Sequence, residues 1–141
     1  MAIYFESERA DVPSIDEKKI STWIEMIVKN HDRELGDITY IFCNDDYILK
    51  INNEYLNHDY YTDIITFNYN EDNIVSGDIF ISIDTVMSNS QKYNTLFSEE
   101  LHRVIIHGIL HLCGLDDHTE KEEINMRNEE EKALNLLENL V

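Results

Sequence analysis

The sequence contains few of the residues that bend, crosslink or positively charge a chain. Its 141 residues include one proline, four glycines and two cysteines, and 11 basic residues stand against 29 acidic ones. So few glycines and prolines exclude a collagen-like or low-complexity chain. Cys43 and Cys113 lie far apart and do not make a disulfide framework, so we expect reduced thiols in a cytoplasmic protein.

Long apolar runs are also missing. No stretch of about eighteen apolar residues is present, so the sequence predicts no membrane span and no membrane partner. The start, MAIYFESERAD, lacks a basic segment followed by an apolar one, and we expect no secretory signal. An apolar fraction of 43% in a chain of this length fits one globular domain with a buried core. We therefore expect residues 1–141 to form a single domain.

The shortage of basic residues bears on nucleic-acid binding. The formal net charge is −18, and no Lys or Arg occurs between Lys50 and Lys92. Phosphate backbones are bound mainly by Lys and Arg, so this charge disfavours DNA or RNA as a partner of the surface as a whole. Any RNA affinity must come from local basic positions, from a bound metal, or from a partner protein.

What the sequence does contain is a cluster of histidines. Three of the six histidines lie within residues 107–118, HGILHLCGLDDH. His107 and His111 are four residues apart, which places them one turn apart on one face of a helix. Gly114 is the residue type that ends a helix, so the chain can turn back and bring His118 towards the same point. A lone histidine on an apolar helix is usually a core residue, but three nitrogen donors with one open position are typical of a catalytic zinc site.

The residue after the first histidine excludes one class of zinc enzyme. Peptidases with the H-E-x-x-H pattern use that Glu as the general base, and this chain has Gly108 there. The base must then come from elsewhere. The acids next to the histidines, Asp116 and Asp117, are candidates, and so is a zinc-bound hydroxide.

Hydrophobic periodicity predicts four strands and five helices. The expected strands span residues 2–8, 37–43, 63–69 and 75–83, and the last two are close enough to form a hairpin. The expected helices span residues 14–30, 45–57, 85–94, 98–113 and 119–138. This order is typical of an α+β domain in which about five helices cover a mixed four-stranded sheet, with the metal-bearing helix at the centre.

Helix starts and inward faces can also be assigned. Capping boxes of Ser14 with Glu17 and of Thr119 with Glu122 are expected to begin the first and last helices. Trp23 lies on the apolar face of the first helix, so we expect it in the core. In the last helix the residues expected to face inward are Ile124, Met126, Ala133, Leu137 and Leu140.

Residues 107–118 resemble the signature of the YbeY family of metal-dependent endoribonucleases, whose usual form is H-G-x-L-H-L-x-G-Y-D-H. Residues 51–67 resemble the family's L-N-x-x-Y-R-x-x-D-x-P-T-D-V-L-S-F, and residues 77–82 resemble its G-D-I-x-I-S. This chain has one extra residue before His118. We align His118 with the family's third ligand, while Asp117 has the strict spacing and is the alternative.

The resemblance implies a zinc-dependent, single-strand-specific endoribonuclease. It would act in ribosomal RNA maturation, at the 3′ end of 16S rRNA, and in ribosome quality control. One Zn²⁺ per chain would be held by His107, His111 and His118, and the catalytic group would comprise His107, His111, Asp116 and Asp117. The implied partners are ribosomal RNA and either ribosomal proteins or a ribosome-associated GTPase, and DNA is not among them.

Three further positions and two alternative functions stay open at this point. The family's Arg after its Tyr is Leu56 here, so a cationic role does not carry over. Asp63 and Asp78 either orient the imidazoles or cap strand ends. The charge and Leu56 favour an alternative, a non-catalytic zinc-stabilised ribosome assembly factor. Another zinc-dependent hydrolase, such as a peptidase, is disfavoured by Gly108.

Overall fold

The computed structural model describes residues 2–56 and 62–140. Residues 57 and 59–61, where the second predicted helix ends and part of the family pattern falls, lie outside these ranges. Within these ranges, four strands and five helices follow one another. In order, they are β1 (Ile3–Glu8), α1 (Glu17–Asn30), β2 (Glu34–Cys43), α2 (Asp45–Leu56), β3 (Ile64–Asn68), β4 (Ile74–Ser82), α3 (Ile83–Lys92), α4 (Phe97–Leu112) and α5 (Glu120–Glu138).

The strands form one mixed sheet in the order β1-β2-β4-β3. β1 pairs with β2, and β2 with β4, in parallel, whereas β3 and β4 form the expected antiparallel hairpin. The predicted fold class, α+β with a mixed four-stranded sheet and five helices, is therefore confirmed. Among the described residues, no helix combines the length and apolarity needed to cross a bilayer.

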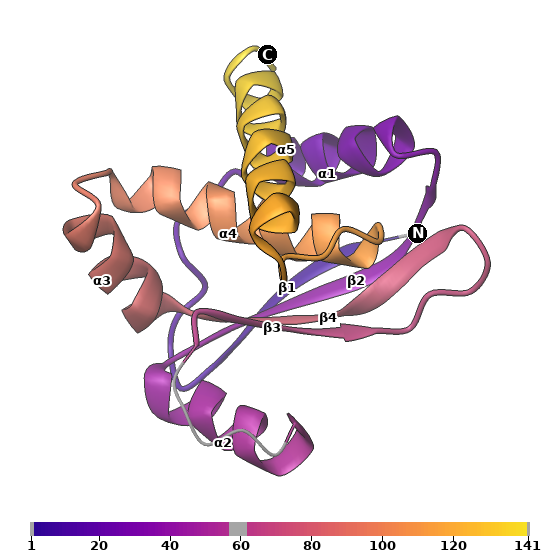
Figure 1. The fold of residues 1–141 in the computed structure, drawn as a ribbon. Coiled ribbons are helices and arrows are strands. Elements are labelled where there is room, and N and C mark those ends of the chain that lie inside the picture. Colours follow the sequence, from indigo (N-terminus) through magenta and orange to yellow (C-terminus); the bar gives the residue numbers. More distant parts are fainter. Residues whose placement is uncertain (1, 57–61, 141) are drawn as a thin grey trace.

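The helices cover the two faces of the sheet unequally. Figure 1 shows α1, α3, α4 and α5 on one face and α2 alone on the other. The large core lies on the four-helix side and includes Trp23, whose indole N–H donates to the carbonyl of Ala133 at 2.7 Å. The prediction that Trp23 belongs to the core is confirmed. A smaller cluster lies beneath α2.

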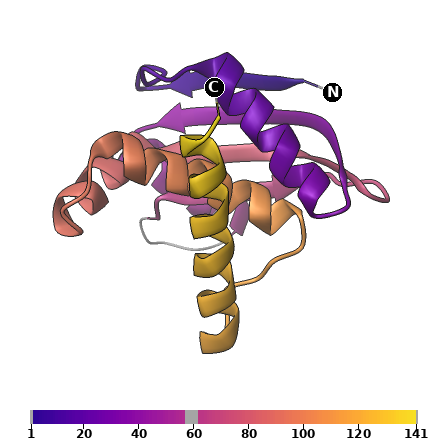
Figure 2. The same cartoon turned by 90° about the horizontal axis from the view of Figure 1, so that it is seen from above.

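Helix α4 is the centre of the domain. It contacts strands β3 and β4 as well as helices α1, α3 and α5, and Figure 2 shows α5 running across it. Its apolar residues face the sheet and the surrounding helices, as expected of a helix that is apolar on nearly all sides. Gly108 allows the close approach to the sheet, because a Cβ there would lie 3.0 Å from the Ile64 side chain and 3.1 Å from that of Ile79.

The end of α4 redirects the chain towards its histidines. Gly114 has φ +103°, its N–H donates to the carbonyl of His111, and the N–H of Leu115 donates to that of Leu110. This pair of bonds with a glycine in the left-handed region is the Schellman arrangement that ends many helices. Asn70 of the β3–β4 turn donates to the Leu112 carbonyl at 2.8 Å and ties this end of α4 to the hairpin. The helix stop predicted from Gly114 is confirmed.

Three local predictions were wrong. Asp16, not Ser14, caps α1, because its carboxylate accepts the N–H of Lys19 at 3.1 Å and the helix begins at Glu17. Strand β2 begins at Glu34 rather than after Gly36, with a register shift against β4 that encloses this glycine. Ile124 is 57% exposed, since it lies in the part of α5 that precedes the buried face. The capping box of Thr119 and Glu122 is confirmed.

Candidate metal centre and the adjoining pocket

Three side chains at the end of α4 and in the loop after it converge on one point. They are His107, His111 and Asp117, whose donor atoms all lie within 4.8 Å of one another. Oδ2 of Asp117 lies 3.4 Å from Nε2 of His107 and 3.4 Å from Nε2 of His111. The turn at Gly114 makes this convergence possible, because it returns the chain to the face of α4 that carries both imidazoles.

In both imidazoles the second ring nitrogen, Nδ1, makes a hydrogen bond that fixes the orientation of the ring. Nδ1 of His107 lies 2.6 Å from Oε2 of Glu130, and Nδ1 of His111 lies 2.9 Å from the carbonyl oxygen of Leu115. A carbonyl only accepts hydrogen bonds, so Nδ1 of His111 must carry the proton. Glu130 likewise accepts the proton of His107 Nδ1. In the neutral form of each imidazole the proton therefore lies on Nδ1, and the Nε2 lone pair faces Asp117.

This geometry fits a tetrahedral metal. Donors bound to zinc at about 2.0 to 2.2 Å are separated from one another by about 3.3 to 3.5 Å in a tetrahedron, which agrees with the two distances to Asp117. A direct hydrogen bond between an imidazole and a carboxylate would be shorter, about 2.7 to 3.2 Å. Histidine ligands whose second nitrogen donates to a carboxylate or a carbonyl are typical of zinc sites. The group can hold a metal ion.

The charges around His107 shift the pKa values of the two partners of this hydrogen bond in opposite directions. Burial by itself lowers the pKa of His107, but the hydrogen bond and charge of Glu130, with Asp117 and Asp63 nearby, outweigh it and raise that pKa. Burial likewise raises the pKa of Glu130, yet hydrogen bonds from His107 and Arg103 outweigh it and hold that pKa below its usual value. Glu130 is thus a carboxylate, fixed between Arg103 and His107.

The other candidate site residues predicted from the sequence lie at different places relative to the donor group. His118 and Asp116 are exposed, and neither belongs to the convergent donor group of the described residues. The extra residue after Gly114 explains this, because the turn brings the residue at the family's strict spacing, Asp117, to the imidazoles. Asp63 lines the pocket beside His107, and Asp78 accepts the hydroxyl of Tyr69 at 3.3 Å. The ligand and base roles of these residues stay predictions.

Sequence reasoning missed Glu130, which performs the orienting role that was considered for Asp63 and Asp78. Glu130 is 5% exposed, and its oxygens bond to His107 at 2.6 Å and to Arg103 at 2.8 Å. The spacing of buried residues in α5 could have indicated Glu130 from the sequence. Glu130 stands at the helical spacing of the buried Met126 and Ala133, and an acid at an inward position usually has a specific partner.

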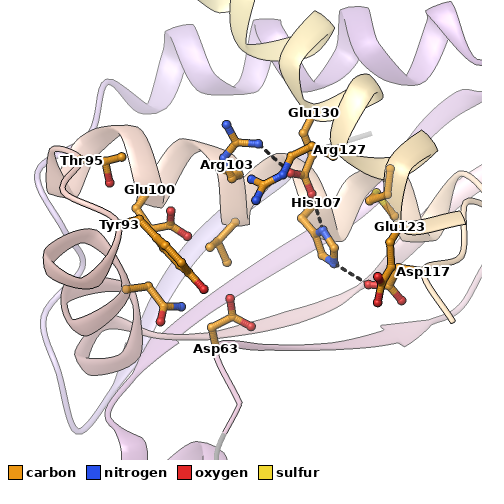
Figure 3. Close-up of a pocket in the computed structure, with 13 residues that line it drawn as sticks. Asp63, Tyr93, Thr95, Glu100, Arg103, His107, Asp117, Glu123, Arg127 and Glu130 are labelled. Carbon is orange, nitrogen blue, oxygen red and sulfur yellow. Dashed lines mark hydrogen bonds and ion pairs between the residues drawn. The ribbon is translucent and has the colours of Figure 1, made fainter. Parts of the chain in front are cut away.

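A pocket of about 470 Å³ adjoins the donor group and extends along α4 towards its start. Figure 3 shows His107 and Asp117 at one end of this pocket and Glu100 and Tyr93 at the other. Its acidic side chains outnumber its two arginines, Arg103 and Arg127. The charged residues that line it are Asp63, Glu100, Arg103, His107, Asp117, Glu123, Arg127 and Glu130.

Leu56, the position of the family arginine, is the last residue of α2 and is 40% exposed. Helix α2 covers the opposite face of the sheet from α4 (Figure 1). Leu56 does not line the pocket of the described residues, and it brings no positive charge. The arginines of the pocket come from α4 and α5 instead.

Comparisons with known proteins identify relatives along nearly the whole chain. The family model described as Endoribonuclease YbeY matches residues 3–138. A protein of Parabacteroides distasonis named Endoribonuclease YbeY is 50% identical over 137 residues, which cover 97% of this chain and 96% of the relative. Another of that name, from Azobacteroides pseudotrichonymphae, is 52% identical over 134 residues, which cover 95% of this chain and 96% of the relative.

A solved structure agrees with the sequence relatives. The solution structure of the Thermotoga maritima protein TM1509 superposes with a TM-score of 0.68 at 28% identity, covering 96% of this chain and 89% of the other. The residues that the family model matches contain all of the described strands and helices. The resemblance noted in the histidine motif is thus confirmed, and this chain belongs to the YbeY endoribonuclease family.

Proposed function

We propose that this protein is a metal-dependent endoribonuclease that cuts single-stranded RNA during ribosomal RNA maturation. One observation carries the proposal: two imidazoles, whose Nε2 atoms face the same carboxylate, converge with it beside an open pocket. Family membership supplies the reaction class, because the relatives are named endoribonucleases. The finer assignments that the resemblance implies, the 3′ end of 16S rRNA and ribosome quality control, belong to the same proposal.

Zinc, one ion per chain, is the metal we propose. Two neutral imidazoles and one carboxylate form a three-ligand set that zinc enzymes use, with a fourth position left for water or substrate. A zinc ion bound there would lower the pKa of a coordinated water to about 7 and would offset negative charge on a phosphoryl group. His107, His111 and Asp117 are the proposed ligands, and Glu130 and the Leu115 carbonyl orient the two imidazoles.

The chain's own residues also restrict the substrate. The net charge of −18 opposes a broad contact with phosphates. A duplex is held mainly through its backbone, whereas a single strand can place its bases in a pocket. The cavity beside the metal group is a place where such a base can bind. Single-stranded RNA is therefore the substrate class that fits, and a ribosomal protein or GTPase partner could bring it to the site.

Charge supports one competing function. A protein with this acidity attracts basic ribosomal proteins, and Leu56 lacks the charge of the family arginine. A zinc-stabilised assembly factor that binds such proteins and cuts nothing would share every structural feature of the donor group. The two functions differ in chemistry alone, so a cleavage assay distinguishes them.

The test is cleavage of a single-stranded RNA by protein carrying one zinc per chain. We expect internal cuts that a chelator abolishes and added zinc restores, with a duplex of the same sequence cut far more slowly as the control. A protein that carries the metal and stays folded, yet leaves every single-stranded RNA intact, would establish the assembly-factor alternative.

A further inference from the structure

The pocket beside the metal group contains a buried acid that has no partner among the described residues. Glu100 lies on α4, seven residues before His107, and therefore two turns away on the same face of the helix. It is 8% exposed. Among the described residues its carboxylate makes no hydrogen bond or ion pair. Every side-chain oxygen or nitrogen of these residues that is fully buried has a hydrogen-bond partner, so the unpartnered Glu100 oxygens are not fully buried. The Glu100 oxygens therefore open onto the pocket that Glu100 lines.

An unpartnered carboxylate at this depth is costly. Burial raises the pKa of Glu100, and the charges of Arg103 and Arg127 only partly offset this effect. Arg103 is already paired with Glu130 at 2.8 Å and with Glu131. A buried polar group without a partner usually marks a place where a ligand completes the hydrogen bonds.

The other walls indicate what kind of ligand fits. Tyr93 ends α3 and is 57% exposed. Its ring contacts no other aromatic ring of the described residues and has only Lys92 Nζ at 5.4 Å from its centroid. In Figure 3 the side chains of Tyr93, Glu100 and Asp63 point towards the same space. The flat ring can stack on a flat ligand, and the carboxylates can accept hydrogen bonds from its N–H groups. The same carboxylates would repel a phosphate at this end of the pocket.

We propose that this pocket binds an unpaired guanine base of the RNA, with Glu100 accepting the N1–H and one N2–H of its Watson–Crick edge and Tyr93 stacking on its face. This inference rests on the proposed function, since it names the base next to the cut. Guanine is the base that presents two adjacent donors to a two-oxygen carboxylate. Adenine and cytosine present a donor beside an acceptor, and uracil presents one donor between two carbonyl oxygens, which a carboxylate repels.

The position of the pocket links base recognition to the metal group. His107 and Asp117 line the same cavity as Glu100, so a base bound at one end places its phosphate towards the other. Arg127 of α5 also lines the cavity, is exposed, and makes no ion pair among the described residues. Its guanidinium is the available cation for that phosphate. The volume of about 470 Å³ is within the range of small-molecule pockets.

The test compares three mononucleotides by NMR titration of the full chain: guanosine, inosine and adenosine 5′-monophosphate. Inosine keeps N1–H and lacks the 2-amino group, so it removes one of the two proposed bonds. A bidentate contact to a base edge typically gives at least about fivefold discrimination. We expect guanosine to bind at least about fivefold more tightly than adenosine, with inosine between them. Equal affinities, or no binding of any of the three at millimolar concentration, would overturn the proposal.

A pair of matched variants then isolates the carboxylate. Glu100→Gln keeps the shape and replaces one acceptor by a donor, which no longer matches the two donors of guanine but matches the donor and acceptor of adenine. The guanosine preference should therefore fall to less than about twofold, with an adenosine affinity equal to or higher than that of the parent. Glu54→Gln, an exposed acid on α2 across the sheet, should keep the full preference. A preference that survives in Glu100→Gln would show that Glu100 has only a structural role.

The binding assay separates this inference from the proposed function, because it requires no cleavage. If the protein prefers guanosine but cuts no RNA, the proposed base pocket is supported and the proposed nuclease function is refuted. Equal cleavage of uridine-rich strands that contain a single guanosine or a single adenosine would retain the nuclease and refute the pocket.

Discussion

One face of α4 carries two regions that differ in how their polar groups are held. At the end of the helix, His107 and His111 each have one ring nitrogen fixed by a partner, Glu130 or the Leu115 carbonyl. Two turns earlier, Glu100 is buried to a similar or greater degree and has no partner among the described residues. The same helix thus presents one preorganised group and one that is left unsatisfied.

The difference corresponds to two kinds of ligand. A metal requires donors at fixed separations, so each donor gains from a rigid support. A substrate base arrives with its own donors, and a carboxylate that already had a partner could not accept them. The end of the helix with the supported His107 and His111 therefore suits a permanently bound ion. The end with the unpartnered Glu100 suits a substrate group that binds and dissociates. Substitutions at each end therefore test the two kinds of ligand separately.

Loss of a direct ligand should have the largest effect. Asp117→Asn removes the charge of the carboxylate that faces both imidazoles, and we expect the zinc affinity to fall by more than about 100-fold, beyond the usual effect of an indirect contact. His118→Ala is the matched control one residue away, and its zinc affinity should stay within about threefold. Competition with a coloured chelator measures both. The reverse order would make His118 the third ligand, as the sequence alignment predicted.

Loss of the support behind His107 should have the next largest effect. Glu130→Gln keeps the shape but weakens the hydrogen bond to Nδ1, and indirect contacts of this kind typically change metal affinity by about 10- to 100-fold. Glu131→Gln is the control, because Glu131 contacts Arg103 and does not contact either imidazole. Zinc affinity is again the measurement. An unchanged affinity in Glu130→Gln would mean that the imidazole needs no support from α5.

At the unsupported end, a substitution should raise stability. The folded-state pKa of Glu100 is raised above its usual 4.5, so its contribution to stability is fully present below pH 4.5 and is lost as the pH rises through the folded pKa. At pH 7, Glu100→Gln should therefore raise the melting temperature. A gain of about 1 kcal/mol corresponds to about 3 °C in a domain of this size.

The advantage of Glu100→Gln over the parent should disappear at low pH, since both side chains are then neutral. Thermal unfolding at pH 4 and pH 7 measures this difference, with Glu54→Gln as the exposed control. A lower melting temperature for Glu100→Gln at pH 7 would reveal a partner for this carboxylate in the folded protein.

The smallest effect concerns phosphate contacts. With Leu56 in place of an arginine and Arg127 as the available cation of the pocket, RNA binding should weaken only gradually with salt. Each phosphate contact to a single strand changes the slope of log affinity against log salt by about 0.7, so Arg127→Gln should reduce the slope by about that amount. Lys121→Gln, on the same helix and outside the pocket, should not change it. A steep slope in the parent would require a basic surface elsewhere.

Local signals in the sequence predicted most of the fold. The periodic apolar positions located every strand and helix to within a few residues, and Gly114 and the Thr119–Glu122 box marked their ends correctly. The error at the first helix has a local cause. Ser14 with Glu17 and Asp16 with Lys19 offer competing caps two residues apart, and pattern alone does not rank them.

The site was less accessible from the sequence, because it depends on distances between segments. The spacing of His107 and His111 placed two donors on one face, since a helix fixes that relation locally. The choice between Asp117 and His118 depends on the path of the loop after Gly114, and Glu130 reaches His107 only because α5 packs across α4. The unpartnered state of Glu100 is a property of all its neighbours together.

The most direct test of the metal-dependent nuclease compares the parent with His111→Ala in two assays, cleavage of single-stranded RNA and thermal unfolding. The account predicts that His111→Ala abolishes cleavage at every zinc concentration. With a chelator present, its melting temperature should stay within about 3 °C of the parent, because the lost bond to Leu115 contributes about 1 kcal/mol. Added zinc should stabilise the parent alone. A large loss of stability in His111→Ala, together with no cleavage by the zinc-loaded parent, would contradict the account and favour a structural metal.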